Sequence, residues 1–312
     1  MPRLRFDRSR GRCRAGQALR IGSVVAGYGE SIPKLIHSLW FQGRDNAPDL
    51  VRLNFARWAR LNPDYRLQVL ERRDVEALLD GYGIAIAGLG PAALSDIVRA
   101  RLLLDHGGIW VDASLFPVEP LDQWLDHMLT PSGFFAFERP GPDRPISTWF
   151  LVATPGNPIF HKWWGETTRF WSKPRRLVEG IPADPAGSVS PEVAAANEVY
   201  PYFWFHYLFA HLLKTDAEVE ALWRNCVKCS ARSPHQLQFL FARRGKPSEA
   251  RIRKAAACAP VQKLNWRASY PLDVLDRLAS LPLRPSGEQG PAAELIRLAF
   301  SKLWKRGDGR GR

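Results

Sequence analysis

The stretch from Leu94 to Phe116, LSDIVRARLLLDHGGIWVDASLF, places the strongest constraint on what this chain can fold into. Its first half carries apolar residues at near-helical spacing and ends at Gly107-Gly108, a pair that tolerates the positive φ common after a helix. Ile109 to Val111 is then typical of a short buried strand, and Asp112 follows where that strand should end. The stretch therefore predicts a helix that leads directly into a strand.

The same spacing predicts that three charged side chains converge. We expect Ser95 to be the helix N-cap, with Asp96 in the first turn and Arg99 three residues later on the same face. Eleven helical residues rise about 16 Å and five extended residues span about as much, so Asp112 should return to their level. Two carboxylates and a guanidinium at the carboxyl end of a strand suit a ligand site. The alternative is a helix–strand hairpin whose charges are solvated or paired with one another.

The second informative stretch is Ile32 to Gly43, IPKLIHSLWFQG. It predicts a first strand from Lys34 to Trp40, followed by a turn at Phe41-Gln42-Gly43. An aromatic residue at the end of such a strand could lie against a flat nucleobase. On the residues alone, a place for Trp40 in the hydrophobic core is the favoured interpretation.

The remaining pattern alternates between strands and helices, which is typical of an α/β fold. Strands are expected at 65–70, 131–137 and 148–153, and helices at 48–61, 74–79, 159–171 and 200–213. A proline-rich loop should follow Glu138. No dinucleotide-binding glycine motif and no P-loop occur in the sequence.

Charge is concentrated toward the two ends of the chain. The 312 residues carry a net charge of +13, which predicts attraction to polyanions such as sugar nucleotides, anionic lipid or nucleic acid. We expect a basic, disordered arm at 1–30, a catalytic domain at 31–275, and a Pro/Gly linker with a basic amphipathic helix at 276–312. That helix could lie on an anionic membrane surface or dock on the protein's own core. With no apolar run of 18 residues and no apolar signal core, we expect a cytoplasmic protein, with peripheral contact at the inner membrane face as an option.

The two stretches together resemble one glycosyltransferase family. SDIVR followed by HGGIWVDAS is similar to its pattern of Ser-Asp-x-x-Arg, a helix, Gly-Gly, an aromatic, one residue and Asp-x-Asp. IPKLIHSLW is similar to its opening Ile-Pro-Lys-x-Ile-His-x-x-Trp. The family includes capsular-polysaccharide synthesis proteins, yeast-type initiating mannosyltransferases and the glucosylating domains of clostridial toxins. The resemblance is closest to the capsular branch and covers roughly Ile32 to Arg267.

The resemblance implies a fold and a reaction. The fold would be glycosyltransferase-A-like, with a Rossmann-like mixed sheet flanked by helices. The reaction would be transfer of a sugar from a nucleotide-sugar donor to a carbohydrate hydroxyl, in capsular or other surface polysaccharide synthesis. A lipid-linked oligosaccharide would be one form of acceptor. Stabilisation of the leaving nucleotide diphosphate would supply most of the catalysis.

The resemblance also implies roles for individual residues. Asp96 and Arg99 would hold the donor sugar, and Asp112 would lie on the ribose and metal side. Trp40 would stack on the donor base. Leu39 and Trp110 would be further donor-binding residues, and His37 is a candidate that would support the first strand.

The resemblance also implies a divalent metal, Mn²⁺ or Mg²⁺, with Asp112 and Ser114 at the two positions of the metal-binding motif. The second acidic position of the family motif is Ser114 in this chain. Mn²⁺ and Mg²⁺ prefer oxygen ligands, and carboxylates supply both charge and geometry, whereas a serine hydroxyl is a weaker, neutral ligand. Asp112 could hold the ion partly through water, or mainly contact the ribose.

Three further residues are candidates. Glu138 could bind an acceptor hydroxyl, although a solvated loop acid is the favoured interpretation. His206, in the aromatic segment Tyr200 to Leu213, resembles the histidine of a family helix, and a core position is favoured over a ligand or acceptor role. Lys263, in PVQKLNWR, resembles the family's closing Lys-Leu-x-x-Lys and could balance the leaving diphosphate, unless it is ordinary surface charge. A loop at 171–191 could close over the donor.

Two other function classes are each consistent with part of the sequence. A nucleic-acid or polyanion-binding protein should gather its basic residues on one folded face, whereas much of the excess here lies in the two tails, so no nucleic-acid partner is expected. A glycoside hydrolase could use Asp96 and Asp112 as its two carboxylates. The nearby Arg99, however, suits an anionic ligand better than an oxocarbenium centre.

Overall fold

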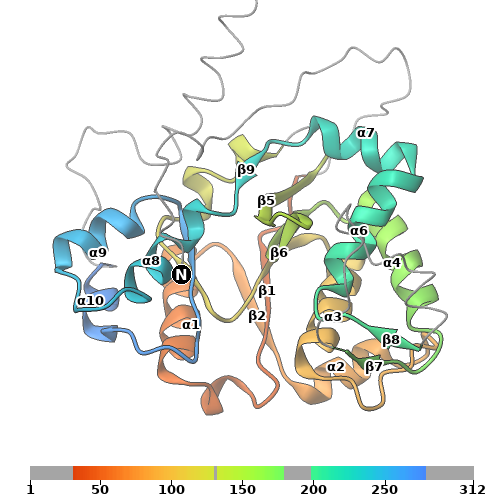
Figure 1. Cartoon of the computed structure of the whole chain (residues 1–312), viewed down its shortest axis with the longest axis horizontal. Coiled ribbons are helices and arrows are strands. Elements are labelled where there is room, and N and C mark those ends of the chain that lie inside the picture. The colour runs from red at the N-terminus through yellow and green to blue at the C-terminus, as the bar shows by residue number, and fades with distance from the viewer. Residues whose placement is uncertain (1–30, 130–131, 179–197, 279–312) are drawn as a thin grey trace, which may run out of the picture.

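The computed structural model describes residues 31–129, 132–178 and 198–278, shown in Figure 1. The expected basic arm at 1–30 lies outside the described residues. Residues 179–191 of the expected loop also lie outside the described residues, as does the tail beyond 278, where a basic amphipathic helix was expected. None of the described helices has the length and apolar character needed to cross a membrane.

The centre of the molecule is a six-stranded mixed sheet with the strand order β2-β1-β3-β6-β5-β9. Its strands are β1 (Leu35–Leu39), β2 (Arg66–Leu70), β3 (Gly108–Val111), β5 (Phe134–Gly141), β6 (Arg144–Ala153) and β9 (Cys229–Ser230). β1 runs parallel to both β2 and β3, β6 runs antiparallel to β3 and β5, and β9 runs parallel to β5. The predicted α/β fold with a mixed sheet is confirmed.

Helices cover both faces of this sheet (Figure 1). The described α-helices are α1 (Asp49–Leu61), α2 (Arg72–Leu79), α3 (Pro91–Asp105), α4 (Pro158–Phe170), α6 (Trp204–Thr215), α7 (Ala217–Asn225), α8 (Gln236–Phe241), α9 (Glu249–Ala256) and α10 (Leu272–Arg277). Two small two-stranded sheets join β4 (Leu115–Pro117) to β10 (Val261–Lys263) and β7 (Arg176–Leu177) to β8 (Val199–Tyr200). The pairing of β4 with β10 brings the last third of the described chain back to the centre.

The alternation of side chains along β3 divides the core into two layers. Trp110 packs with α3, α4 and α6, whereas Ile109 and Val111 pack on the other face with Trp58 of α1. Because every side chain of β3 is buried, the strand lacks the polar alternation of a solvent-facing strand.

Two expectations about local structure were wrong. α3 begins one turn earlier than predicted, at Pro91 after Gly90, because proline favours the first helical turn and has no N–H to satisfy there. Ser95 is therefore inside the helix and is not its N-cap, and Asp96 is not in the first turn. The expected proline loop after Glu138 is instead a longer β5–β6 hairpin, in which Glu138 pairs with Ile146 after a register shift.

The turn between α3 and β3 fixes where β3 starts. Gly107 and Gly108 have φ values of 60° and 86°, so both glycines have the positive φ that the sequence analysis expected after the helix. The carbonyl oxygen of Gly107 accepts a hydrogen bond of 3.1 Å from Nε2 of His37 on β1. Burial lowers the pKa of His37 to about 4, so this ring is neutral and ties the turn to the neighbouring strand.

We predict that Gly107→Ala destabilises the protein much more than Gly156→Ala. The two glycines have nearly the same φ, 60° and 62°, so alanine at either position costs about 1–2 kcal/mol of conformational energy. A Cβ on Gly107 would also lie 2.5 Å from the backbone nitrogen of Pro155, whereas nothing lies within 4 Å at Gly156. The total for Gly107→Ala should reach about 2–5 kcal/mol in urea unfolding. Equal losses in the two variants would show that close packing at this turn is unimportant.

Candidate functional site

The charged side chains predicted to converge do so at the carboxyl end of β3. Arg99 Nη1 lies 3.1 Å from Asp96 Oδ1, and Arg99 Nη2 lies 3.3 Å from Asp112 Oδ1. The side chains of Arg99, Asp96 and Asp112 are 6%, 10% and 24% exposed, so Asp112 is the most accessible of the three. α3 and β3 thus place a buried arginine between two carboxylates.

Arg99 is held in this position by three elements of the fold. Its Nη1 donates to the carbonyl oxygen of Thr148 on β6 at 2.7 Å, and its Nη2 donates to Ser95 Oγ at 2.8 Å. The guanidinium also lies over the ring of Trp110, 4.9 Å from its centroid. Trp110 Nε1 in turn donates to Asp112 Oδ1 at 3.0 Å. The orientation of the arginine is therefore fixed before any ligand arrives.

Lys263 supplies a second cation from a distant part of the sequence. Its Nζ donates to Asp112 Oδ2 at 2.9 Å and to Ser114 Oγ at 2.6 Å. This contact follows from the pairing of β10 with β4, in which Lys263 is opposite Leu115. The four charged residues Asp96, Arg99, Asp112 and Lys263 are called the charge cluster below.

The two carboxyl groups of the charge cluster are in opposite electrostatic situations. Burial would raise the pKa of Asp112, but the charges of Lys263 and Arg99 and hydrogen bonds from Lys263 and Trp110 outweigh it and lower the pKa to about 2. Burial raises the pKa of Asp96 to about 7, with the charge of Arg99 opposing that change and the charge of Asp112 adding to it. Asp112 is thus a fixed anion, whereas Asp96 can exchange a proton near neutral pH.

An aromatic pair lies at the same edge of the sheet. Trp40 follows β1 and is half-buried, and its ring contacts that of Trp266 edge to face at a centroid distance of 5.3 Å. Trp40 also packs against a small cluster that includes Ala113, next to Asp112. Leu39, by contrast, is buried among the α3-side core residues. Trp40 and Trp266 are both partly exposed, whereas Leu39 is buried.

The segment after Asp112 is held by side chains that the sequence analysis did not single out. Ser38 Oγ donates to Val111 O at 2.8 Å, and Asn54 Nδ2 donates to Ala113 O at 2.9 Å. Both donors are fully buried. Two features of the sequence could have indicated these contacts. One is a serine in a mainly apolar strand, and the other is an asparagine on the buried side of α1. Trp266 was also missed, although it lies only three residues after Lys263.

Two other candidates differ in their relation to the charge cluster. His206 Nε2 lies 3.3 Å from Thr148 Oγ1, so it contacts the residue whose carbonyl holds Arg99. Burial lowers the pKa of His206 to about 3, and the ring is neutral. Glu138 is on β5, two strands away from β3, where it pairs with Ser230 of β9. The structure therefore does not bring Glu138 to the cluster, and it is not the loop acid that we expected.

Comparison with known proteins supports one family. The family model described as "Capsular polysaccharide synthesis protein" matches residues 24–179, half of the 312-residue chain. "Putative glycosyltransferase HOC1" of Saccharomyces cerevisiae is 26% identical over 151 residues, covering 42% of this chain and 38% of that protein. "O-glycosyltransferase braB" of Annulohypoxylon truncatum is 28% identical over 159 residues, covering 44% of this chain and 38% of that protein. The matched part of the chain thus spans well under half of these curated relatives.

Among solved structures, the PaToxG glycosyltransferase aligns over 90% of this chain and 90% of its own, with a TM-score of 0.43 and 16% sequence identity.

We predict that Asp96→Asn changes how stability depends on pH. The raised pKa means that between about pH 4 and 7 the native state holds more protons on Asp96 than the unfolded state does. This carboxyl therefore makes the free energy of unfolding fall as the pH rises through that window. An asparagine side chain does not titrate there, so the variant lacks this dependence. The free energy of unfolding of the variant minus that of the unsubstituted protein should rise from about pH 4 to 7 and then level off.

Urea unfolding at several pH values tests this prediction. Asp80→Asn is the matched comparison, because this aspartate is exposed after α2 and lies outside the charge cluster. The difference between the free energy of unfolding of this variant and that of the unsubstituted protein should not vary between about pH 5 and 8. A pH-independent difference for Asp96→Asn would contradict the prediction.

Proposed function

The chain belongs to the family of capsular polysaccharide synthesis proteins, and on that premise we propose that it is a glycosyltransferase. It would transfer a sugar from a nucleotide-sugar donor to a carbohydrate hydroxyl, in the synthesis of capsular or another surface polysaccharide. The observation that carries this proposal is the charge cluster at the carboxyl end of β3, with Arg99 and Lys263 on the two oxygens of Asp112. Both curated relatives are named as glycosyltransferases, which agrees with this proposal.

The cluster suits a donor whose leaving group is a diphosphate. As the bond between the anomeric carbon and the diphosphate oxygen breaks, its electron pair goes to that oxygen. The new bond forms to the acceptor oxygen, whose proton passes to the departing diphosphate. Lys263, 19% exposed and fixed by two acceptors, would balance the charge that develops. A cation that is already positioned needs no reorganisation at the moment of reaction, and this is the largest source of stabilisation in many enzymes.

The remaining parts of the donor would lie around this point. As the family resemblance implies, Asp96 and Arg99 would bind the hydroxyls of the donor sugar. Asp112 would contact the ribose, and Trp40 would stack on the base. The contact between Trp40 and Trp266 supports a base site there, because two tryptophans at this edge offer an apolar wall to a flat ring.

The side chains present do not fit the divalent metal that the resemblance implies. The oxygen set consists of Asp112 and the neutral hydroxyl of Ser114, and Lys263 Nζ bridges the two at 2.9 and 2.6 Å. A manganese or magnesium ion at this position would have one carboxylate as its charged ligand. That carboxylate is already paired with the ammonium of Lys263 and the guanidinium of Arg99, which would repel the ion. In the part of the chain that the structure describes, no three His, Cys, Asp or Glu side chains are grouped to hold a metal. We infer that the ammonium of Lys263 supplies the charge that a metal supplies in Asp-x-Asp enzymes.

The acceptor and the location of the enzyme are further proposals. A carbohydrate or a lipid-linked oligosaccharide would serve as acceptor, and the cytoplasm, at the inner membrane face, would be the place of reaction. Membrane contact would come from the basic amphipathic segment 292–306, which lies outside the described residues. The hydrolase alternative is disfavoured, because Asp96 and Asp112 are both ion-paired to one buried arginine.

We predict that a uridine or guanosine diphosphate sugar raises the melting temperature of the protein and that Asp112→Asn greatly weakens this effect. Replacing the carboxylate releases Lys263 and removes the proposed ribose acceptor, so the dissociation constant should rise about tenfold or more. Asp80→Asn, at an exposed aspartate after α2, is the matched control and should bind like the unsubstituted protein. If no nucleotide sugar stabilises the folded chain, the proposed function is wrong.

A second prediction concerns the metal. Removing divalent ions with a chelator should leave nucleotide binding unchanged, whereas Lys263→Gln should weaken it about tenfold or more. Lys254→Gln, at an exposed lysine of α9, controls for the loss of one positive charge. The double variant Ser114→Asp with Lys263→Gln restores the two acidic positions, and its binding should depend on manganese. Loss of binding by the unsubstituted protein on chelation would contradict the role given to Lys263.

A further inference from the structure

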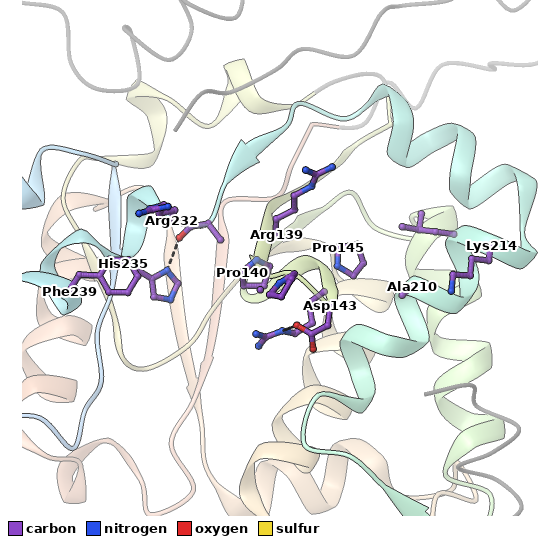
Figure 2. Close-up of a pocket in the computed structure, with 14 residues that line it drawn as sticks. Arg139, Pro140, Asp143, Pro145, Ala210, Lys214, Arg232, His235 and Phe239 are labelled. Atoms are coloured by element: carbon purple, nitrogen blue, oxygen red, sulfur yellow. Dashed lines mark hydrogen bonds and ion pairs between the residues drawn. The ribbon is translucent and has the colours of Figure 1, made fainter. Parts of the chain in front are cut away.

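A separate cavity of about 1040 Å³ surrounds the tip of the β5–β6 hairpin. Figure 2 shows Arg232, His235 and Phe239 on one side of the tip and Ala210 and Lys214 of α6 on the other. Three prolines of the tip, Pro140, Pro142 and Pro145, also line it. We call it the hairpin cavity. It contains none of the residues of the charge cluster.

The lining of the hairpin cavity is strongly basic. Arg139, Arg144, Lys214 and Arg232 line it together with one carboxylate, Asp143, which gives a net charge of three positive units among these side chains. Asp143 already has local partners, since it lies 3.1 Å from Arg144 Nε and accepts a hydrogen bond of 2.7 Å from the hydroxyl of Tyr207. The charge of this cavity therefore favours an anionic ligand.

Apolar surface lies between these charges. Phe239 is 42% exposed, one of the few large apolar side chains in the described residues that reach solvent, and its ring stacks against that of His235. Burial lowers the pKa of His235, as do the charges of Lys263 and Arg144, so this ring is a mainly neutral flat surface. Aromatic and proline surface beside cations suits a ligand with both ring faces and negative charges.

The hairpin cavity and the charge cluster lie along the same strand. Arg144 begins β6, and Thr148, whose carbonyl oxygen holds Arg99, comes four residues later, a distance of about 13 Å in an extended strand. His206 of α6 contacts Thr148 between the two sites. A chain of several sugar units is long enough to span this distance.

We propose that the hairpin cavity binds an acidic oligosaccharide acceptor, a glycan that carries carboxylates on its sugar rings. This proposal rests on the proposed glycosyltransferase function, whose acceptor class it specifies. The cations come from the hairpin tip, from α6 and from the segment after β9, on both sides of the tip (Figure 2). Charges spread in this way match repeated carboxylates better than the compact diphosphate of a lipid carrier. The volume is at the upper end of the range for small-molecule pockets, which also favours an oligomer.

Calorimetric titration of the full chain tests the proposal with three probes. These are a galacturonic acid tetrasaccharide, maltotetraose as its neutral counterpart, and geranyl diphosphate as a lipid diphosphate. We expect the acidic tetrasaccharide to bind at least about tenfold more tightly than the neutral one, and its binding to weaken as salt is added. Neutral and acidic probes of equal affinity, or binding of geranyl diphosphate alone, would overturn the proposal.

A matched pair of double variants assigns the binding to this cavity. The double variant Arg139→Gln with Lys214→Gln removes two exposed cations of the lining. It should lower the affinity for the acidic tetrasaccharide about tenfold or more. Arg251→Gln with Lys246→Gln removes one exposed arginine and one exposed lysine elsewhere and should leave that affinity unchanged. Equal effects of the two double variants would place the acidic probe elsewhere and refute the proposal.

The failure of this inference can be told apart from the failure of the proposed function. Nucleotide-sugar titration of the unsubstituted protein decides whether a donor site exists, and it involves none of the four substituted residues. If the protein binds a nucleotide sugar but does not prefer the acidic tetrasaccharide, the proposed transferase function is supported and only the acceptor assignment is overturned. If the acidic probe binds at the hairpin cavity but the protein binds no nucleotide sugar, the cavity is an anion site and its role as an acceptor site is overturned.

Discussion

The candidate site depends on the contacts of one buried group, the guanidinium of Arg99. It joins α3, β3 and β6 by bonding Asp96, Asp112 and the carbonyl oxygen of Thr148. Removing one partner from a buried charge network is costly, because the remaining charges keep their desolvation penalty without compensation. The arginine therefore both positions the carboxylates and makes their burial tolerable.

The sequence predicted the parts of the site that local rules control. The convergence of Asp96, Arg99 and Asp112 follows from two periodicities and a two-glycine turn, and all of this information lies within 23 residues of the chain. The start of α3 was misplaced because Ser95 is a good N-cap, and the competing preference of Pro91 for the first turn was overlooked. The hairpin tip was predicted as a loop because prolines usually break strands, yet they are tolerated here in a protruding strand end.

Long-range pairing explains what the sequence could not show. Lys263 was a candidate only through resemblance, and its contact with Asp112 across 151 positions depends on the pairing of β10 with β4. No periodicity in the sequence predicts such a pairing, because the register depends on tertiary packing. The hairpin cavity was missed for the same reason, since its lining comes from three separate segments.

The separation of Lys263 from the rest of the cluster also bears on how such a site can evolve. The family model ends at residue 179, so the motif that would bind the donor lies inside the match and the cation that completes it lies outside. The cluster is therefore assembled from two parts of the chain that lie 151 positions apart and are joined by the pairing of β4 with β10. Two substitutions, one at Lys263 in β10 and one at Ser114 after β3, could replace the lysine ammonium with a bound divalent metal ion. Neither substitution would alter α3 or β3, the helix and strand that would hold the donor.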